Sequence, residues 1–258
     1  MGQVSVTPPQ DQQPDIHPSP TDEVAELEAA LERSLRVINH LEAALEQRAG
    51  DAGTESHQPV AIVGMSCRFP GGANDPAAFW DLLAGGREAR APMAADRWTG
   101  PGAPPLGHFL DRVPYGVDDR VFRLSPEEIR GLDPQQRLLL ELAFEAFEDA
   151  GLPQGQLEGS RTGVFLGLEK ADFIRAGLYS GDPERITPYT ATGIAGSAAA
   201  GRISYLFDLR GPCLSLDAAC ASSLVAVDQA CASLRRGDCT MALAGAVSLM
   251  LAPEPFTA

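Results

Sequence analysis

One cysteine, Cys220, lies where a strand-like segment gives way to a helix-like one. The residues from 213 to the turn are apolar and alternating, which predicts a buried strand, and those after Cys220 predict an amphipathic helix. Only small residues surround the junction. A thiol at a helix N-terminus lies beside free N–H groups and the positive end of the helix dipole, which favour the thiolate. The same N–H groups can hold a developing oxyanion, so this turn could present a nucleophile that becomes acylated.

The alternative for Cys220 is a packing role, because free cysteine is among the most buried residue types. Other chemistries have weaker support. The chain has no G-x-x-x-x-G-K-[ST] phosphate loop, and Ser197 does not lie in a G-x-S-x-G turn. Its five cysteines form no C-x-x-C pair, and no two histidines have metal-ligand spacing, so neither a disulfide framework nor a zinc site is expected.

The elements around the turn follow from hydrophobic periodicity and from helix start and stop signals. Asp133 is the expected N-cap of the strongest helix, Pro134 its first residue and Gly151 its terminator. Strands are predicted at 60–67, 162–167 and 240–251 and before Cys220, and helices at 76–83, 133–151, 188–200 and from Cys220 to about 236. Residues 85–131 are predicted mainly as a surface excursion. Alternating strands and helices predict an α/β sheet covered on both faces.

The N-terminal quarter has a different character. Residues 1–21 are rich in Pro, Gln, Asp and Ser and predict a flexible tail, and 49–58 form a polar linker. Between them, residues 22–48 carry apolar residues at heptad spacing: Val24, Leu27, Leu31, Ile38, Leu41 and Leu45. This pattern predicts a short coiled-coil helix that pairs with a copy of itself or with a partner helix. The alternative is a helix packed on its own domain.

Composition narrows the class of partner. The 258-residue chain has a net charge of −15, so nucleic acid and anionic membrane are not expected as partners, and basic carrier surfaces are better matched. No apolar run is long enough to span a bilayer and no secretory signal is evident. We expect a reducing, cytoplasmic setting.

Four ordered motifs resemble the N-terminal half of a β-ketoacyl synthase domain of a modular type I polyketide synthase. They begin at Val60-Ala-Ile-Val-Gly-Met-Ser-Cys-Arg-Phe-Pro-Gly, Asp133-Pro-Gln-Gln-Arg, Gly201-Arg-Ile-Ser-Tyr and Asp217-Ala-Ala-Cys-Ala-Ser-Ser-Leu. The last resembles the family's active-site motif but has Ala218 and Ala221 at two small-residue positions, from which we expect altered hydrogen bonds and intact chemistry. The resemblance implies that 59–258 are the N-terminal half of a thiolase-like αβαβα layered fold, and that 22–48 resemble a docking helix.

The resemblance also implies a reaction. Cys220 would accept an acyl chain from the phosphopantetheine thiol of an acyl carrier protein, and the carbanion from a decarboxylated malonyl-type extender would then attack this thioester. No cofactor is expected on this chain, because 4'-phosphopantetheine arrives on the carrier protein. Expected partners are that carrier protein, an upstream polyketide synthase subunit bound through residues 22–48, the missing C-terminal half, and a second copy in a homodimer.

The family completes its site with two histidine motifs and a lysine that this sequence lacks. The four histidines are His17, His40, His57 and His108, none follows Cys220, and none is assigned a role. The chain is therefore expected to be a fragment or one part of a split enzyme, inactive alone in carbon–carbon bond formation, with an open apolar face. Two alternatives stay open: a non-catalytic docking and dimerisation module, and a thiolase-fold synthase that uses CoA esters. The sequence does not identify the acyl chain, the extender or the product.

Overall fold

The computed structural model describes residues 59–95, 97–98, 102–113, 116–169, 172–175 and 179–252, together with Glu32, Leu35, Arg36 and Asn39. The chain divides into two compact units, 1–57 and 58–258. The four described N-terminal residues are helical, and Glu32 lies 3.6 Å from Arg36 in an ion pair one turn apart. The predicted tail (1–21), the linker (49–58) and the heptad positions of the predicted coil (22–48) lie outside the described residues.

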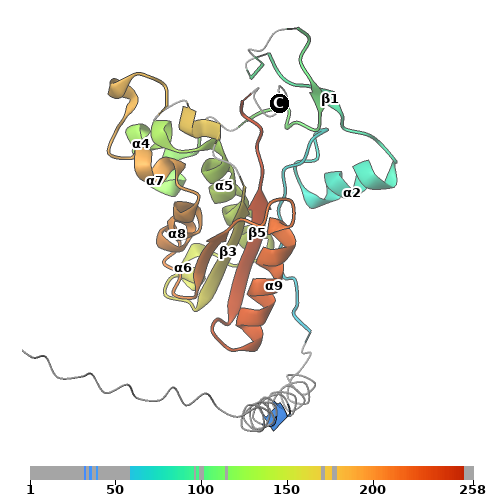
Figure 1. Cartoon of the computed structure of the whole chain (residues 1–258), viewed down its shortest axis with the longest axis vertical. Coiled ribbons are helices and arrows are strands. Elements are labelled where there is room, and N and C mark those ends of the chain that lie inside the picture. The colour runs from blue at the N-terminus through green and yellow to red at the C-terminus, as the bar shows by residue number, and fades with distance from the viewer. Residues whose placement is uncertain are drawn as a thin grey trace, which may run out of the picture. The chain divides into compact units, whose positions relative to one another are not determined.

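A parallel three-stranded sheet forms the centre of the second unit (Figure 1). Its order is β4 (Cys213–Leu216), β3 (Thr162–Leu168) and β5 (Met241–Val247). Val164 of β3 pairs with Cys213 of β4, and Thr162 pairs with Met241 of β5. Because all three strands run in the same direction, their carboxyl ends meet at one edge of the sheet. The predicted strands at 162–167, before Cys220 and within 240–251 are confirmed.

Helices cover both faces of this sheet, as the sequence predicted (Figure 1). Alternate residues of β3 point to opposite faces. Val164 and Leu166 are buried in the main core with α5 (Pro134–Asp149) and α8 (Ser197–Leu206). Phe165 is buried on the other face, against Ala226 and Ala230 of α9 (Ser222–Arg235).

The ends of the helices follow their local chemistry. The Asp133 carboxylate caps α5 by accepting the Gln135 N–H at 2.8 Å, and Gly151 follows the helix with a positive φ of 69°. Gly237, with a φ of 72°, follows α9 in the same way. These left-handed conformations suit glycine because it has no Cβ. The predicted start and stop of α5 and the predicted stop of α9 are confirmed, whereas α9 begins at Ser222, two residues after the predicted start at Cys220.

The region 85–131 is more ordered than predicted. The described second unit has α2 (Pro76–Ala84), as predicted, and continues through a β1–β2 pair (Ala91–Pro92 with Leu106–Gly107), α3 (Asp119–Phe122) and α4 (Pro126–Gly131). The prediction of a surface excursion is wrong for Met93, Phe109, Val113 and Phe122, which are buried. Their scattered spacing shows no period of two or 3.6, so no pattern identified them as core.

The predicted helix at 188–200 is two helices. α7 (Thr190–Ile194) ends before α8 begins at Ser197. The break is fixed from outside, because the Gln136 side-chain amide donates to the carbonyl groups of Gly193 and Ala195 at 2.9 and 3.1 Å. The short helix α6 (Gln154–Leu157) and the 3-10 turns η1 (Asp172–Arg175) and η2 (Pro183–Arg185) complete the described elements.

Two predictions of buried strands need correction. Residues 60–67 form no strand, because none of the described strands pairs with this segment. Ile62, Val63 and Met65 are therefore exposed and not buried in a sheet. The segment lies instead along α5, where the Met65 N–H donates to Asp149 Oδ2 at 2.8 Å. The strand before Cys220 exists as β4, but its first two residues are exposed because β4 is an edge strand.

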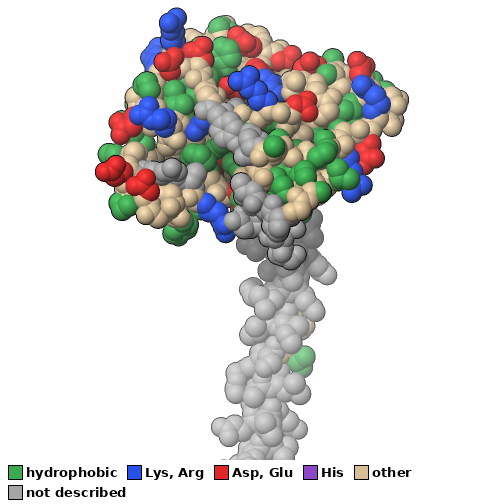
Figure 2. Space-filling view, turned by 90° about the horizontal axis from the view of Figure 1, so that it is seen from above, with side chains coloured by type: hydrophobic (Ala, Val, Ile, Leu, Met, Phe, Trp, Pro, Cys, Tyr) green, Lys and Arg blue, Asp and Glu red, His purple; other side chains and the backbone are tan. Residues whose placement is uncertain are grey.

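The surface is mixed in character. Acidic, basic and apolar side chains are interspersed over the face seen from above in Figure 2. In the described part of the chain, no helix has both the length and the apolar character needed to cross a bilayer.

Candidate functional site

Cys220 lies on the turn between β4 and α9, at the carboxyl edge of the sheet. The turn runs from Asp217, just after β4, to Ala221, the N-cap residue of α9. The thiol of Cys220 belongs to an exposed residue, so the alternative of a buried packing cysteine does not apply. The sequence prediction of a cysteine at a strand-to-helix turn is confirmed, whereas its reactivity stays a prediction.

The backbone of this turn is strained next to the thiol. Ala219 has a φ of +50°, in the left-handed region that L residues rarely adopt. The Asp217 side chain supports this conformation, because its Oδ1 accepts the Ala219 N–H at 2.8 Å. Such conformations cost of order 1 kcal/mol or more, and persist only where the surroundings enforce them. The turn therefore holds Cys220 in a fixed position.

The Ser222 side chain holds the turn from the side of α9. Its hydroxyl donates to the Ala219 carbonyl at 2.7 Å and accepts the Ala218 N–H at 2.9 Å. Ser222 is buried, although the residues around it on the turn are exposed. One side chain in the first turn of α9 thus holds the two residues that precede Cys220.

Gly167 of β3 allows Ser222 to reach this position. A Cβ atom at residue 167 would lie 2.7 Å from Ser222 Cβ and 2.9 Å from its carbonyl carbon, which is too close for any side chain. The sheet and the first turn of α9 therefore meet at a glycine, and the position of Ser222, which holds the Cys220 turn, depends on that contact.

The hydrogen bonds that close the turn use the N–H groups of Ala218, Ala219, Ala221 and Ser222. None of these bonds uses the N–H of Cys220. That group is therefore available to an oxygen atom placed beside the thiol.

A cavity of about 270 Å³ opens at the same edge of the sheet, and we call it the Asp133 pocket. It lies where β3 and β4 end and where α5 and α8 begin, the location at which open α/β sheets bind ligands. Asp217 lines this pocket and also supports the turn that carries Cys220. The lining residues are Asp133, Gln135, Gln136, Leu168, Glu169, Ile194, Gly196, Ser197, Ser215, Leu216 and Asp217.

Asp133 is the most perturbed acid at this edge. Burial raises the pKa of its carboxyl to about 6, against the opposing effects of the Gln135 hydrogen bonds and the Arg137 charge. The residue is 2% exposed. Strong perturbation by burial in a cavity is typical of functional sites, although a helix cap can also have it.

Gln136 organises the wall of the pocket. Its amide nitrogen donates to the carbonyls around the α7–α8 break, and its Oε1 accepts the Arg202 Nε–H at 3.2 Å. Arg202 in turn pairs with Glu128 of α4. Two motifs that are far apart in the sequence, Asp133–Arg137 and Gly201–Tyr205, therefore meet beside the pocket.

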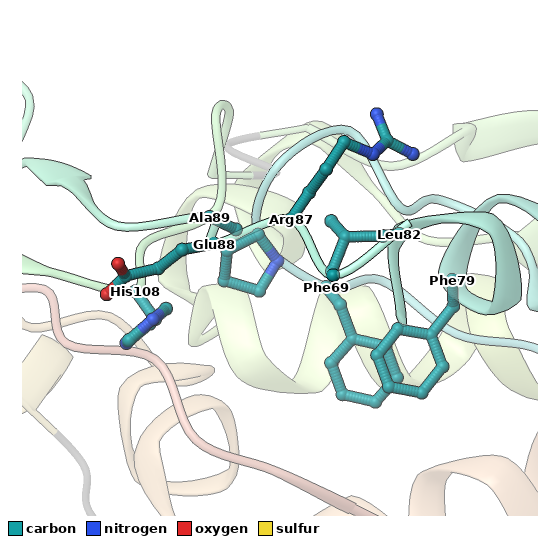
Figure 3. A pocket seen from close by; sticks show the side chains of 9 residues that line it. Phe69, Phe79, Leu82, Arg87, Glu88, Ala89 and His108 are labelled. Carbon is teal, nitrogen blue, oxygen red and sulfur yellow. The ribbon is translucent and has the colours of Figure 1, made fainter. Parts of the chain in front are cut away.

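A larger cavity of about 350 Å³ lies among residues 69–108 (Figure 3). Phe69 and Phe79 stack with ring centroids 4.3 Å apart at one end, and Glu88 and His108 lie near each other at the other. Its lining contains no thiol or hydroxyl, so it offers no counterpart of the Cys220 nucleophile. His108 lies here, away from the residues that form the Cys220 turn, and the other three histidines lie outside the described residues.

Several residues of the site escaped sequence reasoning. Ser222 and Gly167 were not singled out, because the contact between them joins residues far apart in the sequence. The one sequence feature that could have indicated this contact was the small size of both residues, one at the end of a strand and the other just after the turn. Asp133 was predicted as a helix cap and as the first residue of a family-like motif, but not as part of a pocket.

Comparison with known proteins identifies the family of this chain. A family model described as "Beta-ketoacyl synthase, N-terminal domain" matches residues 57–258. The chain is 44% identical over 209 residues to the reducing polyketide synthase ppsB of Aspergillus oryzae, covering 76% of this chain and 8% of that protein. It is 42% identical over 243 residues to a phenolphthiocerol/phthiocerol polyketide synthase of Mycobacterium tuberculosis, covering 89% and 11%. The chain thus spans a small part of these relatives.

Solved structures give the same result. An oxazolomycin ketosynthase domain of Streptomyces albus is similar with a TM-score of 0.67 and 34% identity, over 76% of this chain and 35% of that domain. The module 6 ketosynthase of the Bacillus subtilis bacillaene synthase is similar with a TM-score of 0.64 and 34% identity, over 76% and 33%. These likenesses confirm the predicted thiolase-like α/β fold class.

Proposed function

Because this chain belongs to the β-ketoacyl synthase family, we propose that it serves polyketide chain extension and that Cys220 accepts the acyl chain. The observation that carries the proposal is the exposed thiol on a strained turn whose closing hydrogen bonds leave the Cys220 N–H unused. A nucleophile needs an accessible sulfur, a fixed position and a donor for the oxyanion, and this turn supplies all three.

The acyl-transfer step follows from this geometry. The Cys220 thiolate attacks the carbonyl carbon of an acyl thioester carried on phosphopantetheine. In the tetrahedral intermediate, the oxyanion accepts the Cys220 N–H. The bond from carbon to the carrier sulfur then breaks, the carrier thiolate leaves and takes a proton, and the acyl group remains on Cys220 as a new thioester. The donor in this step is an acyl carrier protein, which carries the acyl group on 4'-phosphopantetheine.

Condensation would complete the reaction. Decarboxylation of a malonyl-type thioester releases carbon dioxide and leaves an enolate, which attacks the Cys220 thioester and expels the Cys220 thiolate. The groups that assist decarboxylation are expected to be histidines outside this sequence, because none follows Cys220. We therefore expect the 258-residue chain to become acylated but to form no β-ketoacyl product alone.

Acylation can be tested on the chain directly. The purified chain is incubated with acyl-pantetheine or with an acyl carrier protein loaded with the same acyl group, and the adduct is located by intact-mass and peptide mass spectrometry. We expect one adduct on Cys220, lost in Cys220→Ala and kept in Cys213→Ala. Cys213 is a matched control because it is also exposed and lies on the preceding strand. An adduct that survives in Cys220→Ala, or no adduct on a folded chain, would refute the proposal.

The same assay separates the alternative functions. A thiolase-fold synthase that uses CoA esters would be acylated by acyl-CoA and not by the carrier-bound acyl group. A purely docking module would give no adduct with either. The docking role of residues 22–48 lies outside the described residues and stays a prediction, tested by binding to a C-terminal peptide of an upstream polyketide synthase protein.

We also propose that the chain forms a homodimer through the β4 side of the sheet. β4 is an edge strand, and an unpaired edge with apolar residues is a template for pairing. Leu214 on β4 is exposed, and so is Tyr205, to 90%, on α8, the helix that packs against β4. Sedimentation of the wild type and of Leu214→Glu tests this, with a dimer expected only for the wild type. A monomeric wild type would refute it.

A further inference from the structure

The larger cavity, among residues 69–108, takes no part in the proposed acyl transfer, and we call it the Phe69 pocket (Figure 3). Its volume of about 350 Å³ lies in the range of small-ligand sites, about 300–1,000 Å³. None of the residues of the Cys220 turn lines it. The lining residues are Phe69, Pro70, Phe79, Leu82, Gly86, Arg87, Glu88, Ala89 and His108.

The wall of the Phe69 pocket is held in place by the protein itself. The Phe69 N–H donates to the Ala73 carbonyl at 2.8 Å, which closes the turn between them. Gly71 in this turn has a φ of 77°, and a Cβ atom there would lie 2.7 Å from Ala89 Cβ and 2.9 Å from Leu82 Cδ1. The turn therefore packs directly on α2 and on the loop that follows it. A ligand would not have to order this wall, so little binding free energy would be lost in forming the site.

One end of the pocket is aromatic. The rings of Phe69 and Phe79 lie with their centroids 4.3 Å apart and their planes inclined by 30°, and Leu82 lies beside them (Figure 3). Phe69 is 43% exposed, so the protein leaves much of this ring uncovered. Uncovered aromatic surface inside a cavity favours contact with a ring or with another apolar group of similar size.

The other end of the pocket has a carboxylate and an imidazole. Glu88 and His108 lie near each other there (Figure 3). Within the part of the chain that the structure describes, neither side chain has a hydrogen bond or an ion pair. An ionised carboxylate only accepts hydrogen bonds, and an unprotonated imidazole has one accepting nitrogen. A group with several N–H donors and a positive charge, such as an ammonium, therefore matches this end of the pocket.

Arg87 does not change this match. Its guanidinium points away from Glu88 and His108 (Figure 3). Arg87 Nε lies 3.3 Å from the position that a Cβ atom at Gly85 would occupy, so the side chain folds back over the end of α2. A positive charge is favoured there by the helix dipole. The polar end of the pocket is thus set by Glu88 and His108, and a carboxylate ligand would face Glu88 as a like charge.

We propose that the Phe69 pocket binds a small primary amine that carries an aromatic ring or another apolar group of that size. The ammonium donates to the Glu88 carboxylate and to an imidazole nitrogen of His108, and the apolar group contacts Phe69 and Phe79. This binding site is a function beyond the proposed acyl transfer and does not depend on acylation of Cys220.

A set of compounds of matched length tests the ligand class. The compounds 3-phenylpropylamine, 3-phenylpropan-1-ol and 3-phenylpropionate share ring and chain but differ in the polar group, and propylamine lacks the ring. Each is titrated into the 258-residue chain at about pH 8, where an ordinary imidazole is neutral and a primary amine is charged. Binding is followed by the imidazole NMR signals of His108, identified by their loss in His108→Gln.

We expect 3-phenylpropylamine to bind with a Kd of about 1 mM, as suits a ligand of about ten non-hydrogen atoms, and to shift the His108 signals. The other three compounds should bind roughly tenfold more weakly or not at all, because each lacks one of the two matched contacts. If the alcohol or the carboxylate binds as tightly as the amine, or if the amine leaves the His108 signals unmoved, the proposal is overturned.

Variants identify the carboxylate responsible. Glu88→Gln keeps the length of the side chain but removes its charge, so it should weaken binding of 3-phenylpropylamine by roughly tenfold and abolish its advantage over the alcohol. Asp81→Asn is the matched control, because Asp81 is exposed on α2, next to Leu82, but does not line the pocket. Unchanged affinity in a folded Glu88→Gln chain, or an equal loss in Asp81→Asn, would contradict the assignment. Circular dichroism and thermal melting show that each variant is folded.

Discussion

Replacing Gly167 with alanine should displace the Cys220 turn. The added Cβ would lie 2.7 Å from Ser222 Cβ, 2.9 Å from its carbonyl carbon and 3.0 Å from its carbonyl oxygen. Ordinary contacts of this kind are about 3.5–4 Å, so the first helical turn of α9 must move by roughly 0.5–1 Å. Most of the opposing atoms are Ser222 backbone or Cβ, which no rotamer change can remove from the way.

The cost follows from the overlap. Overpacking of this size destabilises a folded domain by about 1–3 kcal/mol, and a gain of about 0.4–1 kcal/mol from the lower chain entropy of alanine offsets part of it. A net loss of about 1–2 kcal/mol should lower the melting temperature by roughly 2–8 °C. A nucleophile displaced by about 1 Å can lose about a hundredfold in rate, so acylation should suffer more than stability.

Thermal melting and the rate of Cys220 acylation, measured on the same preparation, test both expectations. Gly245→Ala is the matched control, since Gly245 lies on the neighbouring strand β5 and its added Cβ would meet only Leu166 Cδ2, at 3.9 Å. This control should melt and react like the wild type. If Gly167→Ala is acylated at the wild-type rate, or if Gly245→Ala loses as much, the reasoning about the turn fails.

Three further changes probe the same site. Ser222→Ala removes two hydrogen bonds, so it should lower the free energy of unfolding in urea by about 1–2 kcal/mol and should slow acylation of Cys220. Exposed Ser223→Ala should change neither quantity. Equal effects of the two substitutions would contradict the role of Ser222 in holding the turn. The pKa of Asp133 is raised from 3.8 to about 6 in the folded state, which therefore binds this proton more tightly than the unfolded state does. The contribution of Asp133 to the free energy of unfolding therefore falls by about 2 kcal/mol as pH rises from 4.5 to 7, and Asp133→Asn should lack that fall. If the free energy of unfolding in urea depends on pH in the same way for the two proteins, the expectation is refuted. Gln136→Leu removes the hydrogen bonds to the Gly193 and Ala195 carbonyls and the acceptor of the Arg202 Nε–H, and should cost about 2 kcal/mol in thermal melting. Exposed Gln156→Leu should be neutral, and a wild-type melting curve for Gln136→Leu would contradict its role.

Most elements of the sheet could be predicted because their signals are local. The strand at 162–168, the helix capped by Asp133 and the strand–turn–helix around Cys220 each depend on residues within a few positions of one another. The strand predicted at 60–67 failed for the opposite reason. Its apolar residues suit a strand, but a strand exists only beside another, and none of the described strands lies there.

Local sequence is enough to identify Cys220 as the candidate nucleophile, because a cysteine between an alternating apolar run and a helical one must fall at a turn. How that turn is held, and which residues lie beside it, depends on the packed fold. The contact of Ser222 with Gly167, and the placement of Asp133 and Asp217 around one cavity, join residues that are more than fifty positions apart. Such contacts depend on the packing of helices on the sheet, and no local pattern encodes them.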